Sequence, residues 1–384
     1  MDFKLSDEQR AIKDAAREFA EGEFPLVAKD CDREESLDLN LLAKARKLGF
    51  VGVYIPEEYG GQGLGFFEYC LIMEEFCRVD FGLGQAFAVT FGSIIIMEHG
   101  SEELKRRFLI PLAEGDKILS TAITEPDAGS DVTRVRTTAI KDGNEYVIHG
   151  SKMFISNGSL ADYVIVFCKT NPEEPNPHDQ YSCIIVETDR KGFHAEKLKE
   201  KLGIRASDTA ELTFDHVRVP ETNLIGNERE GFRQIQTLFN RERLTVCAQA
   251  IGLAQGALEQ ALRHITKREQ FGQTIGSFQA IRFKVAEMAT LIEAGRSIYY
   301  RAACGIDRGE INHALIAMAK WYCAQNAVRV VDEALQMHGG YGFYNDYDIA
   351  RFYRDAKVLE IYEGTKEIEK IIISNSILGK AKKR

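Results

Sequence analysis

The feature that most constrains this fold is the spacing of apolar residues, which changes twice along the 384-residue chain. Up to about residue 120, apolar residues recur at the spacing of a helix that buries one face. Ser6 and Gln9 form a capping-box pattern near the start of this stretch, and a second helix is predicted over about 41–48. The first part of the chain, residues 1–120, is therefore expected to form an N-terminal helical bundle.

The middle stretch, about 121–228, carries strand signals instead. Two short runs flank the polar segment 141–145 and predict a β-hairpin, while 163–168 and 183–186 are apolar, β-branched runs bounded by polar loops. A β-barrel or β-sandwich domain is expected here.

From about residue 229 to 384 the pattern is helical again. Long periodic runs with few helix-breaking residues cover about 232–267, 276–305, 310–337 and 367–379. Long antiparallel helices of this kind favour a C-terminal four-helix-type bundle. The fold class predicted for the whole chain is α+β, mainly α, in three domains.

Charge and apolar content narrow the class of partner. The net charge of −9 argues against nucleic acid, because a phosphate backbone rewards a basic surface. No segment approaches the ~18 consecutive apolar residues that a membrane span needs. The N-terminus matches neither a secretory signal nor an Arg-rich transit peptide, which indicates the cytoplasm, or the mitochondrial matrix if a transit peptide has been removed.

The eight cysteines do not suggest a disulfide framework or a metal site. They are scattered, none forms a CxxC pair, and no histidine lies at zinc-ligand spacing from them. Free buried thiols in a reducing compartment are expected, with no bound metal.

Several short motifs follow one another in a fixed order. They are Ile-Thr-Glu-Pro-Asp-Ala-Gly-Ser-Asp at 123–131, Lys-Met-Phe-Ile-Ser-Asn at 152–157, Leu-Gly-Ile-Arg-Ala-Ser-Asp-Thr at 202–209, Arg-Glu-Gln-Phe-Gly at 268–272, Gln-Met-His-Gly-Gly-Tyr-Gly at 336–342, and Ile-Tyr-Glu-Gly-Thr at 361–365. Together they resemble the acyl-CoA dehydrogenase family, in its medium- and short-chain type, over nearly the whole chain. The resemblance implies that family's fold and an FAD cofactor, which must be bound without a Rossmann motif because the Gly-rich segment 60–65 does not fit GxGxxG.

The resemblance also assigns residues to the flavin. It implies that Thr121, Ile123, Thr124 and Ser130 line the ring system and that Gly129 permits close approach. Taken alone, this segment is equally consistent with a polar turn between domains.

A second motif adds an aromatic residue and a hydroxyl group. The family packs an aromatic side chain against the flavin at the position of Phe154 and hydrogen-bonds the ring at Ser156. From the sequence alone, Phe154 can equally be an ordinary core residue.

The cofactor's other end is expected to lie against another subunit. Arg268, Phe271, Gln336 and Gly340 match residues that the family supplies from a neighbouring chain to the FAD pyrophosphate and adenosine. The planar guanidinium group of arginine suits a pyrophosphate. A homotetramer is therefore implied, whereas an arginine on a helix surface would by itself predict only a salt bridge.

Glu363 is the predicted catalytic base. In the family, the glutamate of Tyr-Glu-Gly-Thr removes the α-proton of an acyl-CoA thioester while hydride leaves the β-carbon for flavin N5. Burial raises the pKa of such a carboxyl group and makes it a stronger base. Tyr362 and Gly364 are assigned to the substrate side of this loop, and Thr365 to the cofactor.

A second carboxylate complicates this assignment. Glu242 stands where a minority of the family places its base, although those relatives usually lack the glutamate of Tyr-Glu-Gly-Thr. Arg243, Asn240 and Ser130 are expected on the CoA or substrate side. Glu242 is interpreted as structural or tuning, and a solvated or ion-paired helix residue is the alternative.

The substrate is less constrained than the chemistry. No cation follows Arg78-Val79-Asp80, which disfavours a dicarboxyl substrate, and Gly82 with Gly84 suggests a pocket widened for a branched, cyclic or aryl acyl group. Electron-transferring flavoprotein is the partner that the family implies. Two alternatives stay open: the same site running backwards as an enoyl-CoA reductase, or a catalytically silent flavin- or CoA-binding subunit of an electron-transfer complex.

Overall fold

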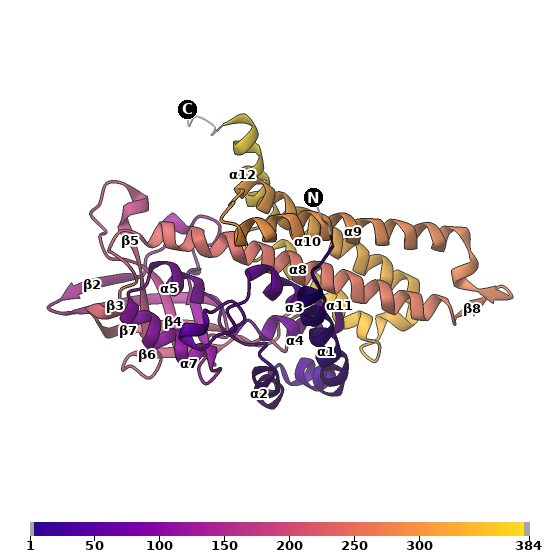
Figure 1. Cartoon of the computed structure of the whole chain (residues 1–384), viewed down its shortest axis with the longest axis horizontal. Helices are drawn as coiled ribbons and strands as arrows, with labels where there is room; N and C mark the ends of the chain where they lie inside the picture. Colours follow the sequence, from indigo (N-terminus) through magenta and orange to yellow (C-terminus); the bar gives the residue numbers. More distant parts are fainter. Residues whose placement is uncertain (1–3, 380–384) are drawn as a thin grey trace.

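The computed structural model describes residues 4–379, so Met1–Phe3, which entered the prediction about leader sequences, and the last five residues lie outside it. The three-part organisation confirms the predicted fold class: an N-terminal group of helices, a curled sheet and a C-terminal helical bundle (Figure 1). The N-terminal helices are α1 (Asp7–Glu34), α2 (Leu39–Lys47), α3 (Phe66–Val79), α4 (Phe81–Ala86), α5 (Ser93–His99), α6 (Glu102–Leu104) and α7 (Ile110–Ala113).

The start of α1 follows from its first residues. The backbone N–H of Gln9 donates to the Ser6 hydroxyl oxygen at 3.1 Å, and the Ser6 N–H donates to the Gln9 side-chain oxygen at 3.0 Å. The predicted capping box is confirmed. Asp38 caps α2 in the same manner, by accepting from the Asn40 N–H at 2.8 Å.

The middle part is a seven-stranded sheet in the order β1-β4-β2-β3-β7-β6, with β5 pairing β4. Alternate residues of β4 face opposite cores: Ile165 and Phe167 pack toward α5 and α7, while Val164 and Val166 face the other side. The predicted hairpin is confirmed as β2 and β3. The strands are β1 (Leu119–Ala122), β2 (Thr138–Asp142), β3 (Glu145–Ser156), β4 (Tyr163–Lys169), β5 (Tyr181–Glu187), β6 (Phe193–Lys197) and β7 (Thr209–Pro220).

The C-terminal helices run side by side away from the sheet (Figure 1). A short hairpin, β8 (Glu269–Gln270) with β9 (Gln273–Thr274), joins the first two at the end of the bundle farthest from the sheet. All four predicted helical runs are present, with ends shifted by a few residues. The helices are α8 (Gly231–Ile265), α9 (Gln279–Asp307), α10 (His313–His338), α11 (Asp348–Ala356) and α12 (Lys366–Leu378).

Helix α3 crosses α8 at very short range. A Cβ atom added to Gly256 would lie 1.9 Å from the Arg78 carbonyl oxygen, and one added to Gly252 would lie 2.1 Å from that of Glu74. Glycine at these positions lets the two backbones touch. This contact joins the N-terminal helices to the C-terminal bundle.

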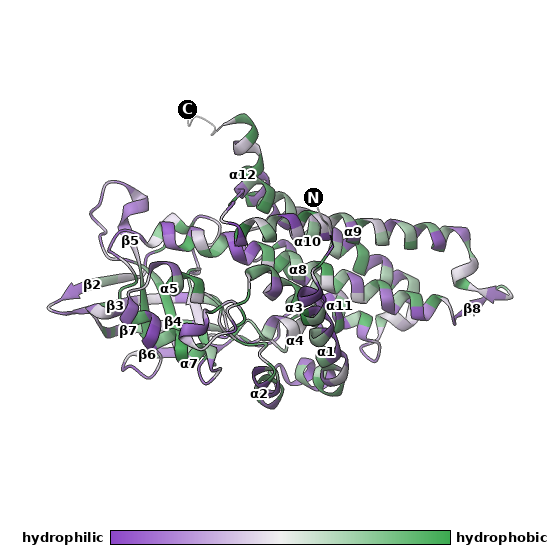
Figure 2. Ribbon diagram, in the orientation of Figure 1, coloured by the Kyte–Doolittle hydropathy of each residue, from purple (hydrophilic) through white to green (hydrophobic). Residues whose placement is uncertain are grey.

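Helix α12 extends away from the body of the chain (Figure 1). Several of its apolar side chains are exposed, including Ile377 and Leu378 at 70% and 83%. In Figure 2 the projecting helix carries green, hydrophobic stretches. Within residues 4–379, no helix is long and apolar enough to cross a membrane.

Candidate active site

Two of the sequence motifs are tied together by a buried ion pair. The Lys152 ammonium, fully buried on β3, lies 3.0 Å from the Glu125 carboxylate and donates to the carbonyl oxygens of Ile123 and Phe167 at 2.9 and 2.7 Å. Glu125 also accepts from the Thr137 N–H at 2.9 Å. The segment after β1 is therefore held against β3, since the buried charges of Lys152 and Glu125 both have partners.

The residues expected to face the flavin lie on this rigid edge. Phe154 is 67% exposed and has a left-handed backbone (φ +62°), so the alternative of a core aromatic residue is wrong. Ser156 and Thr124 are half-buried, whereas Gly129 and Ser130 are exposed. An aromatic ring held out from a rigid strand is suited to stacking on a planar ligand.

Two further residues of this set are less accessible. Ile123 is buried, and Thr121 is buried with its hydroxyl group donating to the Phe91 carbonyl oxygen at 3.1 Å. Their side chains contribute mainly to the wall behind the segment.

The loop that carries Glu363 connects a 3-10 turn, η8 (Lys357–Glu360), to α12. Glu363 has φ +51° and Gly364 has φ +103°, so two successive residues adopt left-handed backbone. Thr365 then caps α12, its hydroxyl oxygen accepting from the Ile368 N–H at 3.4 Å. A non-glycine residue with left-handed backbone, such as Glu363, is uncommon and is often found at functional sites.

Glu363 is half-buried, and one of its two carboxylate oxygens is shielded from solvent. Its Oε2 atom is buried and has no hydrogen-bond partner among the described residues. Burial raises the pKa of the carboxyl group, the nearby charges of Arg243 and Lys320 oppose that rise, and Glu369 adds to it. The result is a carboxylate that is short of partners and ready to accept a proton.

Glu242 lies on α8 close to this group and is only 6% exposed. Its burial, followed by the negative charge of Glu363, raises its pKa well above the ordinary value. The solvated-helix alternative for Glu242 is therefore wrong. The charge of Glu363 is thus close enough to favour the protonated form of Glu242.

Arg243 forms an ion pair with another residue of the same chain. Its Nε donates to Glu369 at 2.8 Å, and Glu369 is fully buried on α12. The side-chain oxygen of Asn240, one turn earlier on α8, accepts from Nδ1 of His313 at 2.9 Å. Arg243 and Asn240, two of the residues predicted for the CoA or substrate side, thus also fix α8 to neighbouring helices.

A polar network lies beside the Glu363 loop. The Tyr362 hydroxyl donates to Gln249 at 2.6 Å, and the Gln249 amide donates to Gln85 on α4 at 2.7 Å. Gly84, on the same short helix, does not open a pocket: an added Cβ atom would lie 2.5 Å from the Cys77 sulfur atom. The glycine allows α4 to pack on α3, so the argument for a wide acyl pocket from this residue is wrong.

Comparison with known proteins decides the family. Three family models match in sequence: the N-terminal domain of acyl-CoA dehydrogenases at residues 6–116, the middle domain at 120–217 and the C-terminal domain at 229–378.

The chain belongs to the acyl-CoA dehydrogenase family. It is thus an oxidoreductase of a flavin-dependent class. It is 40% identical to an acyl-CoA dehydrogenase of Bacillus subtilis over 98% of this chain and 99% of the relative. It is also 40% identical to the acryloyl-CoA reductase (NADH) of Anaerotignum propionicum, over 98% and 96%.

Solved structures agree with this placement. The butyryl-CoA dehydrogenase of Megasphaera elsdenii superposes with a TM-score of 0.95 at 36% identity, covering 98% of this chain and all of that chain. A chain from a structural study of the electron transferring flavoprotein of Acidaminococcus fermentans superposes with a TM-score of 0.96 at 40% identity, covering 99% and 100%.

The remaining predicted cofactor residues of this acyl-CoA dehydrogenase lie far from Glu363. Arg268 and Phe271 belong to the β8–β9 region at the tip of the bundle, opposite the sheet domain (Figure 1). Phe271 is 93% exposed with φ +52°, and Gln336 and Gly340 are exposed at the nearby end of α10. One chain alone therefore does not bring the two sets of predicted cofactor residues together.

An open groove of about 660 Å³ lies at this tip. The Arg268 guanidinium stacks 5.6 Å from the centre of the Tyr341 ring on its wall, and a Cβ atom added to Gly340 would meet nothing within 4 Å. A positive charge beside open, glycine-lined space suits an anionic ligand.

Sequence reasoning missed two buried residues behind the Glu363 loop. Lys320 on α10 is fully buried and donates to the Leu359 carbonyl oxygen at 2.9 Å and to that of Gly364. Glu369 is the second, through its pair with Arg243. The signal for Lys320 was its position on the apolar face of a helix, four residues after Ile316, where a lysine needs a buried partner.

Proposed function

We propose that this protein is an FAD-dependent acyl-CoA dehydrogenase in which Glu363 removes the α-proton of an acyl-CoA thioester, giving a 2-enoyl-CoA. The observation that carries the proposal is the buried Glu363 oxygen without a hydrogen-bond partner, displayed on a left-handed backbone. A carboxylate that has lost water and gained no donor is a stronger base than one in solution.

The surrounding charges tune this base. Arg243 and Lys320 favour its ionised form, while burial and Glu369 favour the protonated form. Both forms are then accessible, as a group that first accepts and later releases a proton requires. The backbone N–H of Glu363 is proposed to donate to the thioester carbonyl oxygen, which develops negative charge as the α-proton leaves.

The chain has residues that fit the proposed cofactor. Phe154 offers an exposed ring, and the open space at Gly129 and Gly340 allows close approach of a ligand to the backbone. When bound, FAD supplies the acceptor for the β-hydride. The groups proposed to hold it are Thr121, Ile123, Thr124, Gly129, Ser130, Phe154, Ser156 and Thr365 of one chain, with Arg268, Phe271, Gln336 and Gly340 of a neighbouring chain.

The proposed electron acceptor is electron-transferring flavoprotein. The similarity to a chain from the Acidaminococcus flavoprotein study supports this partner. The proposed assembly is a homotetramer, which the separation of the two sets of cofactor residues and the exposed apolar side chains of α12 support.

The direct test is loss of flavin absorbance when acyl-CoA thioesters are added anaerobically to the yellow protein. Glu363→Gln should retain FAD and lose about 10²-fold or more of the bleaching rate, because the base is gone while the shape is kept. Glu242→Gln is the matched control, a second buried carboxyl group on the same site, and should keep much of the rate. The reverse ranking would refute the assignment of Glu363.

The same residues can serve the reverse reaction, and a specific observation favours considering it. The relatives include the acryloyl-CoA reductase (NADH) and, at 35% identity, a 3-(aryl)acrylate reductase of Clostridium sporogenes. In that direction Glu363 would donate the proton to the α-carbon. Two rates separate the directions: oxidation of acyl-CoA by the oxidised protein, and reduction of 2-enoyl-CoA by the dithionite-reduced protein. Both are measured with straight, branched and aryl substrates.

A further inference from the structure

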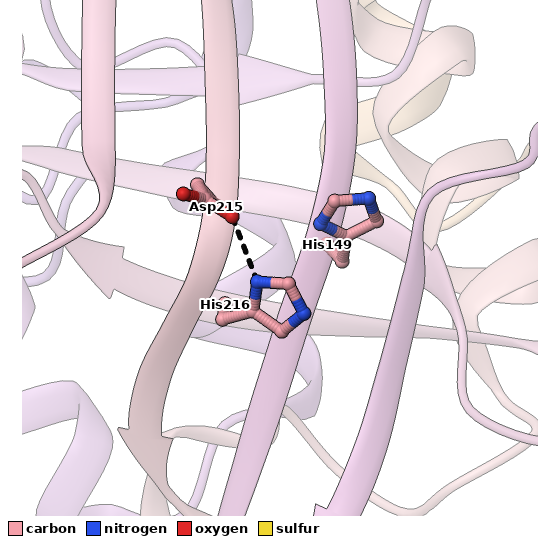
Figure 3. Close-up of side chains that lie close together, drawn as sticks. All are labelled: His149, Asp215 and His216. Carbon is pink, nitrogen blue, oxygen red and sulfur yellow. Dashed lines mark hydrogen bonds and ion pairs between the residues drawn. The ribbon is translucent and has the colours of Figure 1, made fainter.

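An exposed cluster of potential metal ligands lies on the sheet, away from the Glu363 loop (Figure 3). It consists of His149 on β3 with Asp215 and His216 on β7, and it results from an irregularity in the pairing of these strands. Ile148 pairs with Val217 and Gly150 pairs with Phe214, so one residue of β3 faces two residues of β7.

This arrangement is a β-bulge, and it redirects a side chain. His216 has φ +55°, the left-handed conformation that lets the extra residue of a bulge fit. In a regular strand, neighbouring residues point to opposite faces. Here Asp215 and His216 both approach His149, as Figure 3 shows.

The ligand atoms are already close to one another. One nitrogen or oxygen atom from each residue lies within 4.8 Å of the others, and the two imidazole rings are 4.8 Å apart between centres. Nδ1 of His216 and Oδ1 of Asp215 are 2.7 Å apart and share a hydrogen bond. Two imidazole nitrogens and one carboxylate oxygen are the donor types of a zinc site with an open fourth position, and rotation of these exposed side chains can bring the three atoms to coordination distance.

We propose that His149, Asp215 and His216 bind a divalent transition-metal ion, with zinc as the fitting member of that class. The ion would take the place of the proton that Asp215 and His216 share and would link β3 to β7. The site lies at the surface, since the side chains of His216 and Asp215 are 71% and 68% exposed, and water can complete the coordination. The prediction of no metal considered ligands by their spacing in sequence, whereas these three meet only through strand pairing.

The experiment uses the full-length, flavin-loaded protein, made without a polyhistidine tag and stripped with a chelator. Titration with ZnCl₂ in competition with a zinc-sensitive dye should show about one tight site per chain. His149→Gln and His216→Asn should each weaken binding at least roughly tenfold, because each removes one ligand. Asparagine is chosen for His216 because it tolerates left-handed backbone.

His178→Gln is the matched control, an exposed histidine of the same domain that is not part of the cluster. Its zinc affinity should equal that of the unmodified protein. Absence of a tight site, unchanged affinity in the two ligand variants, or equal weakening by His178→Gln would each overturn the proposal. Folding of every variant is checked by its flavin spectrum and melting temperature, both measured without added zinc.

Discussion

Glu363 combines a left-handed backbone with a buried carboxylate oxygen that has no hydrogen-bond partner among residues 4–379. Each feature costs stability, so neighbouring groups must hold the residue in place. Lys320 holds the loop by donating to the Gly364 carbonyl oxygen, and Thr365 holds it by capping α12. The loop is thus fixed by residues that need not touch a substrate.

Glu242 should lower the stability of the folded protein at neutral pH. Its pKa is raised on folding, so the folded state holds the proton more tightly than the unfolded state. As pH rises above the ordinary value of 4.5, the unfolded state ionises first, and stability is lost up to the raised pKa. Glu242→Gln removes this loss and should raise the melting temperature at pH 7.5 by roughly 2 °C or more.

The pH dependence is the control for that prediction. Near pH 4, Glu242 is largely protonated in both the folded and the unfolded state. The variant and the unmodified protein should therefore melt at similar temperatures there in differential scanning calorimetry. A variant that is destabilised at pH 7.5, or equally stabilised at both pH values, would contradict the burial argument.

The sequence could indicate Glu363 because its motif is local. Tyr-Glu-Gly-Thr consists of four adjacent residues that match the family. It could not indicate that Glu242 is buried, since that depends on how α8 packs against Tyr54 and Tyr69, which are distant in sequence. The pairing of Arg243 with Glu369 is hidden for the same reason. Local motifs identify chemistry, whereas burial is decided by contacts between elements.

At the scale of elements, the first two helices and the four long C-terminal helices were predicted, because their apolar spacing and caps lie within each helix. Helices α3 to α7 and α11 were not predicted one by one. Strand β7 is different, because its register against β3 shifts at a bulge. The bulge depends on pairing with β3, so no signal within β7 alone fixes it. The close crossing of α3 and α8 is likewise a property of two elements together.

That crossing gives a prediction about helix packing. Gly256→Ala should destabilise the protein by more than about 1 kcal/mol, because its added methyl group would overlap the Arg78 carbonyl oxygen and push α3 from α8. Urea unfolding followed by circular dichroism measures the change.

Gly22→Ala is the matched control within α1. An added Cβ atom there meets nothing within 4 Å, so alanine should stabilise the helix by about 0.5–1 kcal/mol through its higher helix propensity. Equal effects of the two substitutions would show that backbone contact between α3 and α8 is not what requires glycine.

At the scale of the whole molecule, strand β3, which carries Phe154 and Ser156, and the β8–β9 hairpin lie at opposite ends of the structure (Figure 1). Arg268→Ala should therefore lower the flavin content of the purified protein, seen as a reduced ratio of absorbance at the flavin band to absorbance of the protein, while the Glu363 loop stays intact. Loss of an arginine from an anion site typically costs about 1.5–3 kcal/mol of binding.

Arg282→Ala, at another exposed arginine near the start of α9, is the control and should retain normal flavin content. Size-exclusion chromatography of both variants separates loss of cofactor contact from loss of assembly. Full flavin content in Arg268→Ala, with assembly unchanged, would remove Arg268 from the proposed cofactor site.

The distance between Phe154 and the β8–β9 tip has a consequence for behaviour in solution. If each cofactor is held jointly by two copies, its retention obeys mass action and depends on how many copies have met. Dilution followed by removal of small molecules would then leave protein with less flavin, without any chemical reduction. The flavin that stays on the protein would report its state of association as well as its amount.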